Sequence, residues 1–181
     1  MSGNLSQPDS RNLLDHFKGR SHEEIITTLD SNDVRLEIAC ENTLRDFNMG
    51  SIVRTANGFG VRRVHIVGRR QWNKRGAMAT NKYLHVYHHP TIEDFVADAR
   101  SRGMALIAIE NNVASESLQR TTLPEKACLI FGQEGPGLSD EFLAIADRVL
   151  HIDQHGSTRS FNVGHAAAIA MYEWSRQHTS T

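Results

Sequence analysis

The sequence predicts an α/β protein with a mostly parallel sheet and helices on both faces, because strand-like and helix-like segments alternate along most of the chain. Several strand-like segments, such as 104–110 and 126–132, are continuous apolar runs. Such runs are typical of parallel strands covered on both faces. At 181 residues and 39% hydrophobic, the chain can bury one good core, so one domain is expected.

Three regions follow one another along the chain. Residues 1–10 are polar and contain a proline, which predicts a flexible tail. Residues 11–30 predict a short helical N-terminal extension. Residues 31–181 hold the alternating segments and form the expected main domain, in which we find no internal repeat, low-complexity segment or linker.

The N-terminal extension carries two helix signals. The first predicted helix covers 11–19 and ends at Gly19. The second covers 21–30 and begins with a capping box, in which Ser21 is followed three residues later by Glu24.

The first half of the main domain predicts two strands around one helix and then a third strand. Residues 34–41 and 64–68 are predicted strands, and 49–60 between them is a predicted helix that closes at a glycine. Residues 85–89 predict a further strand, and 91–103 a capped amphipathic helix.

The second half continues the alternation. Strands are predicted at 104–110 and 126–132, with a polar stretch between them that has no clear assignment. A helix is predicted at 139–147, a strand at 148–153 and a long final helix at 162–177.

The charge of the chain is balanced overall but uneven locally. The net charge of −1 by itself argues against a protein that coats nucleic acid through overall positive charge. A local basic run nevertheless surrounds Trp72 and consists of Arg62, Arg63, Arg69, Arg70, Lys74 and Arg75. This run is either a solvated face or a patch that binds phosphates and stacks a base. If it is such a patch, Arg69, Arg70 and Arg75 are the candidate RNA-binding residues.

Other residue types point away from metals, disulfides and membranes. The two cysteines, Cys40 and Cys128, lie in predicted strands and suggest buried thiols in a reducing compartment. His85, His88 and His89 cluster without cysteines or carboxylates at ligand spacing, so no metal is expected. With no leader and no membrane-length apolar run in the sequence, we expect a cytoplasmic protein.

Residues 131–137, FGQEGPG, place three glycines after a predicted strand. Glycines in this position indicate either a tight turn or a backbone that a ligand approaches closely. The segment matches neither a phosphate loop, since no Gly-Lys-Ser/Thr follows, nor a dinucleotide fingerprint, since it comes late in the chain. Glu134 within it has no conformational reason to be there, which makes it a candidate functional residue.

Two helix starts carry polar residues. Asn48 is a predicted N-cap of the 49–60 helix, and Arg54 lies opposite the apolar face of that helix, as a solvated residue or as part of a phosphate site. Ser160 and Asn162 crowd with further polar residues before the final helix. One of these two would suffice as a cap, so the rest of the polar groups call for another explanation.

Three stretches, taken together and in this order, resemble the SpoU, or TrmH-like, family of RNA ribose 2'-O-methyltransferases of the SPOUT class. They are NMGSIVRTANGFGV, LIFGQEGPGLS and HIDQHGSTRSFNVGHAAAIAMYEW, and the resemblance covers roughly residues 34–178. It implies a C-terminal deep trefoil knot, in which the Gly-rich loop and the polar loop before the last helix hold S-adenosyl-L-methionine, largely through main-chain contacts.

The resemblance also implies site residues. It assigns the catalytic positions to Arg54, Asn48, Glu134, Ser160 and Asn162, and the cofactor-contacting positions to Ile109, Gly132, Ile152 and Phe161. The pair Gly164-His165 departs from the family's more usual serine and small or branched residue, which puts the packing of the last helix in question. The reaction is attack of a ribose 2'-hydroxyl on an already activated methyl group, which needs positioning rather than a metal.

The final helix carries an apolar stripe of mostly small residues: Val163, Ala166, Ala167, Ala170 and Trp174. The stripe packs either on the protein's own sheet or on a second copy. The resemblance favours a homodimer through this helix, with Arg54 acting across the interface on the partner's cofactor.

Three functions remain open, of which the family resemblance favours the first. It is methylation of a ribose in structured RNA, with the D-loop guanosine of tRNA preferred and ribosomal RNA second. The second is a catalytically inactive SPOUT-fold RNA-binding protein, and the third is an unrelated α/β nucleotide-binding protein.

Overall fold

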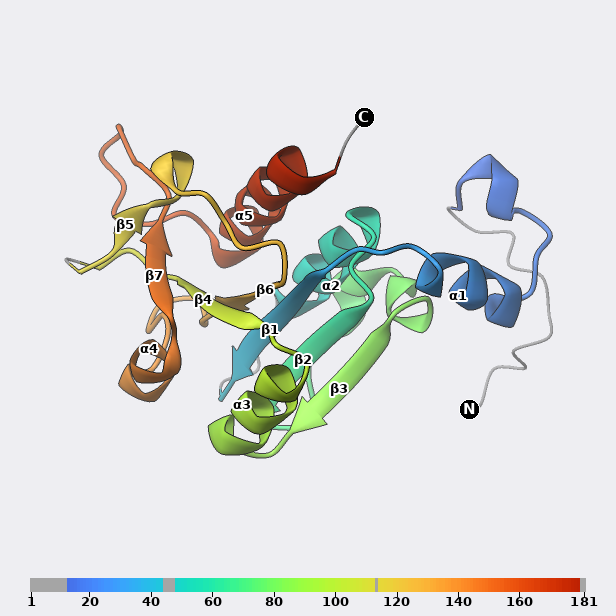
Figure 1. The fold of residues 1–181 in the computed structure, drawn as a ribbon, viewed down its shortest axis with the longest axis horizontal. Helices are drawn as coiled ribbons and strands as arrows, with labels where there is room; N and C mark the ends of the chain where they lie inside the picture. Colours follow the sequence, from blue (N-terminus) through green and yellow to red (C-terminus); the bar gives the residue numbers. More distant parts are fainter. Residues whose placement is uncertain (1–12, 44–47, 113, 180–181) are drawn as a thin grey trace.

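The structure of the protein, a computed structural model, describes residues 13–43, 48–112 and 114–179 (Figure 1). Its centre is a seven-stranded sheet in which the paired strands run parallel. The strands are β1 (Leu36–Asn42), β2 (Arg63–Gly68), β3 (His85–His89), β4 (Ala105–Ile109), β5 (Glu116–Ser117), β6 (Ala127–Phe131) and β7 (Arg148–His151). Their order across the sheet is β3-β2-β1-β6-β4-β7-β5. The predicted α/β class with a parallel sheet is confirmed.

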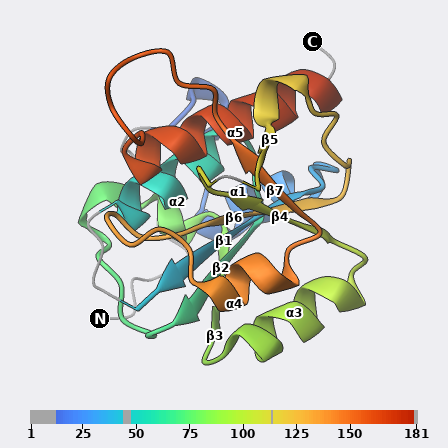
Figure 2. The same ribbon diagram turned by 90° about the vertical axis from the view of Figure 1, so that its left-hand side faces the viewer.

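Helices cover both faces of the sheet (Figure 2). They are α1 (His22–Asp30), α2 (Met49–Gly58), α3 (Ile92–Ser101), α4 (Asp140–Ile145) and α5 (Val163–His178). The apolar side chains of α2 and α5 pack on one face of the sheet, and those of α3 and α4 pack on the other. The central strand β6 is buried along its whole length, which explains the continuous apolar runs of the sequence.

The N-terminal segments only partly match their prediction. The expected tail, 1–10, lies outside the described residues. The capping box is confirmed, because Ser21 and Glu24 exchange hydrogen bonds at the start of α1. In place of the predicted helix over 11–19, however, the described part of that segment forms one 3-10 turn, Asp15–Phe17. So short a segment cannot offset the cost of helix nucleation, and its Phe17 packs on α1 instead.

The polar stretch without an assignment contains the short edge strand β5 and a 3-10 turn, Leu118–Arg120. The structure also shows where the apolar stripe of the last helix packs. Ala167, Ala170 and Trp174 lie in the core under α5, so the helix packs this side on its own sheet and does not offer it to a partner.

A buried polar network links the sheet to α3. Glu37 of β1 accepts a hydrogen bond from Nε2 of His65 at 2.9 Å and one from Nη2 of Arg102 at 2.7 Å. Nδ1 of His65 lies 2.9 Å from Nε2 of His89, and Arg102 also pairs with Asp98 at 2.6 Å. Burial by itself would raise the pKa of Glu37, but the bonds from His65 and Arg102 outweigh it and lower the pKa from 4.5 to about 2.

We expect Glu37→Gln to destabilise the fold at pH 7 by on the order of 2–3 kcal/mol. Because the pKa of Glu37 is lower in the folded state, its contribution is fully present above about pH 4.5 and is lost as pH falls toward 2. Urea unfolding at pH 7 and at pH 3 measures this, and the difference between wild type and variant should shrink at pH 3. Glu93→Gln, an exposed site on α3, is the control. A constant difference at both pH values would contradict the assignment.

In the described part of the chain, no helix is long and apolar enough to cross a membrane.

Candidate active site

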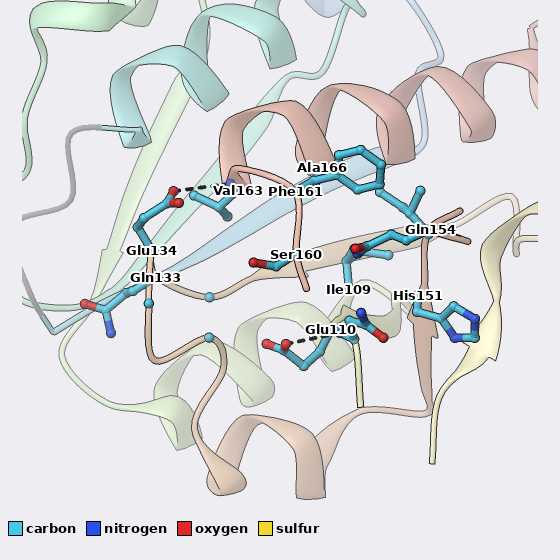
Figure 3. Close-up of a pocket in the computed structure, with 15 residues that line it drawn as sticks. Ile109, Glu110, Gln133, Glu134, His151, Gln154, Ser160, Phe161, Val163 and Ala166 are labelled. Carbon is cyan, nitrogen blue, oxygen red and sulfur yellow. Dashed lines mark hydrogen bonds between the residues drawn. The ribbon is translucent and has the colours of Figure 1, made fainter. Parts of the chain in front are cut away.

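A pocket lies at the carboxyl ends of three adjacent strands, β6, β4 and β7 (Figure 3). In parallel α/β sheets this edge is where ligands bind, because the loops that follow the strands meet there. The pocket is closed on one side by the segment before α5 and by the first turn of α5. Its lining includes Ile109, Glu110, Gly132, Gln133, Glu134, His151, Ile152, Gln154, Ser160, Phe161, Val163 and Ala166.

All four positions that the resemblance assigns to the cofactor line this one pocket. Ile109 and Ile152 stand at the ends of β4 and β7, Gly132 follows β6, and Phe161 precedes α5. They are separated by up to 52 residues in sequence and come together because β6, β4 and β7 are neighbours in the sheet. The pocket therefore combines apolar side chains with main chain at the ends of strands.

The Gly-rich segment forms a tight hairpin over the pocket. Gln133 and Gly137 exchange two backbone hydrogen bonds, each of 3.1 Å. A side chain at Gly132 would place its Cβ 2.2 Å from the carbonyl carbon of Gly137, so the close approach at this glycine comes from the protein's own backbone. Gly135 and Gly137 adopt positive φ angles of 95° and 74°, which other residues rarely do.

Two carboxylates that the sequence prediction missed fix the exit of this hairpin. Glu110, directly after β4, accepts a hydrogen bond from the amide of Leu138 at 2.8 Å, and Glu41 of β1 accepts one from the amide of Ser139 at 2.9 Å. Because β1 and β4 flank β6 in the sheet, the segment after the hairpin is held from both sides. The only signal in the sequence is an acidic residue at the end of an apolar strand, which many solvated carboxylates share.

Three of the predicted catalytic residues meet beside the pocket. Nδ2 of Asn162 donates to Oε2 of Glu134 at 2.8 Å and to Oδ1 of Asn48 at 3.0 Å, and Nδ2 of Asn48 donates to Oε2 of Glu134 at 2.9 Å. Asn48 stands at the predicted N-cap position of α2, but its side chain makes no capping bond. Its amide is instead directed to Glu134.

Asn162 is the polar residue that caps the last helix. Its Oδ1 accepts hydrogen bonds from the amides of Gly164 and His165, so one side chain both caps α5 and joins the cluster. Gly164 is buried, and a Cβ there would lie 3.2 Å from Oδ1 of Asn162 and 3.8 Å from Cβ of Ser51. The lack of a side chain at Gly164 therefore leaves space for the Asn162 cap and for the start of α2. Ser160 lines the pocket and does not cap the helix.

The fifth predicted catalytic residue lies elsewhere. Arg54 is exposed on α2 and is not among the residues that line the pocket. Arg69, Arg70 and Arg75 are likewise exposed, on the segment that follows β2. Within the described residues, none of these four guanidinium groups makes an ion pair or a hydrogen bond to a carboxylate.

The histidines that cluster in the sequence are not the ones that cluster in space. His85 pairs with Asp30 of α1, whereas His65, His89 and Asp98 place three potential ligand atoms within 4.8 Å of one another. Burial, followed by the neighbouring His65, lowers the pKa of His89. Asp98 already pairs with Arg102, and Arg63 lies 3.9 Å from its second oxygen, so the carboxylate is compensated by cations. The absence of a metal stays a prediction.

Residues 35–172 match the SpoU rRNA Methylase family. The chain belongs to this family. It is 32% identical over 145 residues to the tRNA (guanosine(18)-2'-O)-methyltransferase of Escherichia coli K12, an alignment that covers 78% of this chain and 63% of that protein. The chain thus spans less than two thirds of the length of this relative.

Solved structures show the same SpoU-type fold. The AdoMet-bound rRNA methyltransferase from Sinorhizobium meliloti aligns with a TM-score of 0.72 and 25% identity, over 80% of this chain and 57% of that chain. A structure that concerns 2-OH methylation of C/U34 on tRNA aligns with a TM-score of 0.66 and 27% identity, over 78% of this chain and 95% of that chain.

Gly132→Ala should unfold the hairpin or shift it from its position, with a loss of more than about 2 kcal/mol of stability, because the added Cβ meets backbone that cannot rotate away. Thermal unfolding measures the change. Gly156→Ala is the matched control, since no atom lies within 4 Å of its Cβ position. Equal melting temperatures for the two variants would show that the hairpin is not closely packed.

Proposed function

We propose that this protein transfers a methyl group from S-adenosyl-L-methionine to the 2'-hydroxyl of a ribose in structured RNA, with tRNA favoured. The observation that carries the proposal is that one pocket gathers the four cofactor positions and lies against the Asn48–Glu134–Asn162 cluster. This arrangement also argues against an unrelated nucleotide-binding protein, because the Gly-rich segment is a self-packed hairpin with no lysine for a phosphate.

The pocket residues fit the proposed cofactor. Ile109, Ile152 and Phe161 offer apolar surface for an adenine ring, and the ends of β4, β6 and β7 offer main-chain donors and acceptors for its edge. When bound, S-adenosyl-L-methionine supplies a methyl group on a positively charged sulfur. Glu134 at the pocket wall provides a negative charge that favours a cationic ligand.

The chain's own residues would then orient the acceptor. Ser160 lines the pocket and can hydrogen-bond a ribose hydroxyl. The amides of Asn48 and Asn162 hold Glu134 in place. Arginine is a poor general base, so Arg54 would bind the phosphate next to the ribose and lower the cost of ionising the 2'-hydroxyl rather than remove its proton.

Because Arg54 lies outside the pocket of its own chain, we propose a homodimer in which Arg54 serves the pocket of the partner. The surface for this dimer is the exposed side of α5 and the segment before it, where Phe161, Ile169 and Tyr172 are large exposed apolar residues. Phe161 also lines the pocket, so a partner at this surface would stand next to the cofactor.

We further propose that residues 31–181 form the methyltransferase domain and 11–30 an N-terminal extension, and that the C-terminal part of the domain is threaded into the deep trefoil knot implied by the resemblance. Support comes from the family match over 35–172 and from the position of β6, a late strand, between β1 and β4.

The D-loop guanosine of tRNA is the first proposed target, since the E. coli relative is named for position 18. Position 34 of tRNA is an alternative, because the structure concerned with C/U34 is 27% identical to this chain where the two align. Ribosomal RNA is the third. Ribose methylation is mapped in total RNA from the parent strain, from a deletion strain and from the complemented deletion strain. The site that loses and regains its methyl group decides among these three targets. Unchanged methylation at every site would overturn the proposed activity.

Arg54→Ala should lower methyl transfer to tRNA at least a hundredfold while leaving the affinity for S-adenosyl-L-methionine within twofold of wild type. Methyl incorporation measures the first and calorimetry the second. Arg20→Ala, an exposed arginine outside the family match, is the control. Wild-type turnover of Arg54→Ala would remove this residue from the mechanism, and absence of cofactor binding by the wild type would favour an inactive RNA-binding protein.

Light scattering at micromolar concentration should give the mass of a dimer for the wild type. Tyr172→Glu, which adds a charge to the exposed side of α5, should shift the mass toward the monomer and lower activity together. Ala97→Glu, which adds the same charge at an exposed position of α3 on the other face of the sheet, is the control. A fully active monomer would refute both the dimer and the shared site.

A further inference from the structure

A second cavity opens beside the edge strand β3 and is separate from the candidate active site. It is bounded by β3, by the end of β2 with the segment that follows it, and by the 3-10 turn η3 (Thr80–Lys82). Its distinctive lining residues are Arg70, Trp72, Lys74, Asn81 and His88. Two cations, an indole ring and an amide thus share one cavity.

Among the polar side chains that line this cavity, His88 is engaged, because its Nε2 donates to the carbonyl oxygen of Gly68 at 2.8 Å. In the described ranges, the side chains of Arg70, Lys74 and Asn81 make no ion pair and no hydrogen bond, and Nζ of Lys74 only lies 5.6 Å from the ring centroid of Trp72. By contrast, Arg62 and Arg63, at the start of β2, are both engaged by carboxylates. A ligand with negative charge would therefore find both cations of the cavity available.

The walls of the cavity are held in place from the sheet. Buried Asn42, at the end of β1, donates to the carbonyl oxygens of Arg69 at 2.6 Å and of Gln71 at 3.1 Å. These two bonds fix the start of the segment that carries Arg70 and Trp72. Trp72 itself is half-buried, with part of its side chain packed against the core.

The stretch that joins Lys74 to Asn81 does not line the cavity itself, but it is held by a close backbone contact with α2. A Cβ at Gly76 would lie 2.9 Å from the amide of Ser51, and one at Gly50 would lie 2.8 Å from the amide of Ala77. The next two residues, Met78 and Ala79, adopt left-handed φ angles of 47° and 66°. Such strain persists only where the surroundings enforce it, and it concentrates at functional sites.

The cavity faces the same edge of the sheet as the candidate active site. The cavity lies beside β3, and the Gly-rich hairpin follows β6, with β2 and β1 between the two strands. Three strand spacings amount to roughly 14 Å. An RNA chain bound at the active site could therefore extend over the second cavity.

We propose that this cavity binds one unpaired nucleotide of the RNA substrate, with its base against Trp72 and Asn81 and its phosphate on Arg70 and Lys74. The inference rests on the proposed function and adds to it a preference for RNA in which a nucleotide near the target is not base-paired. Aromatic rings and arginines hold unstacked bases of single strands, whereas a base in a helix is already stacked on both sides.

The first test follows the two tryptophans by NMR of their indole N–H groups. A single-stranded RNA hexamer should shift the Trp72 signal and leave the Trp174 signal in place, because the Trp174 indole is buried and donates to the carbonyl of Pro124. Trp72→Phe assigns the two signals. An unchanged Trp72 signal with RNA bound, as followed by fluorescence anisotropy, would overturn the proposal.

The second test compares two double variants with the same loss of charge from the same segment. Arg70→Ala with Lys74→Ala removes both cations of the cavity, and Arg69→Ala with Arg75→Ala removes two cations outside its lining. The first pair should weaken binding of the hexamer on the order of tenfold more than the second, while both weaken binding of a duplex hairpin to a similar extent. If the two double variants lose the same affinity for the hexamer, the four cations act as a uniform basic surface, and the proposal is overturned.

Both tests are done without S-adenosyl-L-methionine and without a methylation target. Inactivity of the protein as a methyltransferase would therefore leave their results interpretable. Conversely, intact methyl transfer to tRNA with an unresponsive Trp72 would overturn the nucleotide cavity alone.

Discussion

The hairpin that follows β6 is the constraint on which the candidate site depends. It can close only because Gly132 lets the backbone of Gly137 approach within a distance that no side chain allows. Glu41 and Glu110 then hold the chain leaving the hairpin to the two neighbouring strands. This fixed loop presents Glu134 to Asn48 and Asn162, so a packing requirement of the backbone places the polar cluster. A rigid support of this kind is what precise positioning of reactants requires.

The Asn162 side chain shows how stability and the site are combined in one residue. Its oxygen caps α5, and its nitrogen bonds to Asn48 and Glu134. A helix cap contributes about 1 kcal/mol, so a change at this residue affects fold and cluster together. Gly164 completes the arrangement, because the absence of a side chain leaves space for α2.

The positive charges of the molecule fall into two groups with different surroundings. Arg63 and Arg102 compensate the buried charge of Glu37, and Arg62 pairs with Asp30 of α1. Arg70 and Lys74 line a cavity without such partners in the described residues. A protein with almost no net charge can in this way retain a local positive potential that attracts an anionic partner.

The sequence by itself determined the parallel sheet and its helices, because the apolar runs of strands such as 126–132 reflect burial on both faces, which is a local property. It also determined the capping box at Ser21, since a cap needs only neighbouring residues, and it identified Glu134 as out of place. Tertiary structure decided the rest. Strand order brought Glu110 and Glu41 to the hairpin, placed His65 beside His89, turned the stripe of α5 inward and left Arg54 outside the pocket. These contacts join residues far apart in the chain, and no local pattern encodes which distant segments become neighbours.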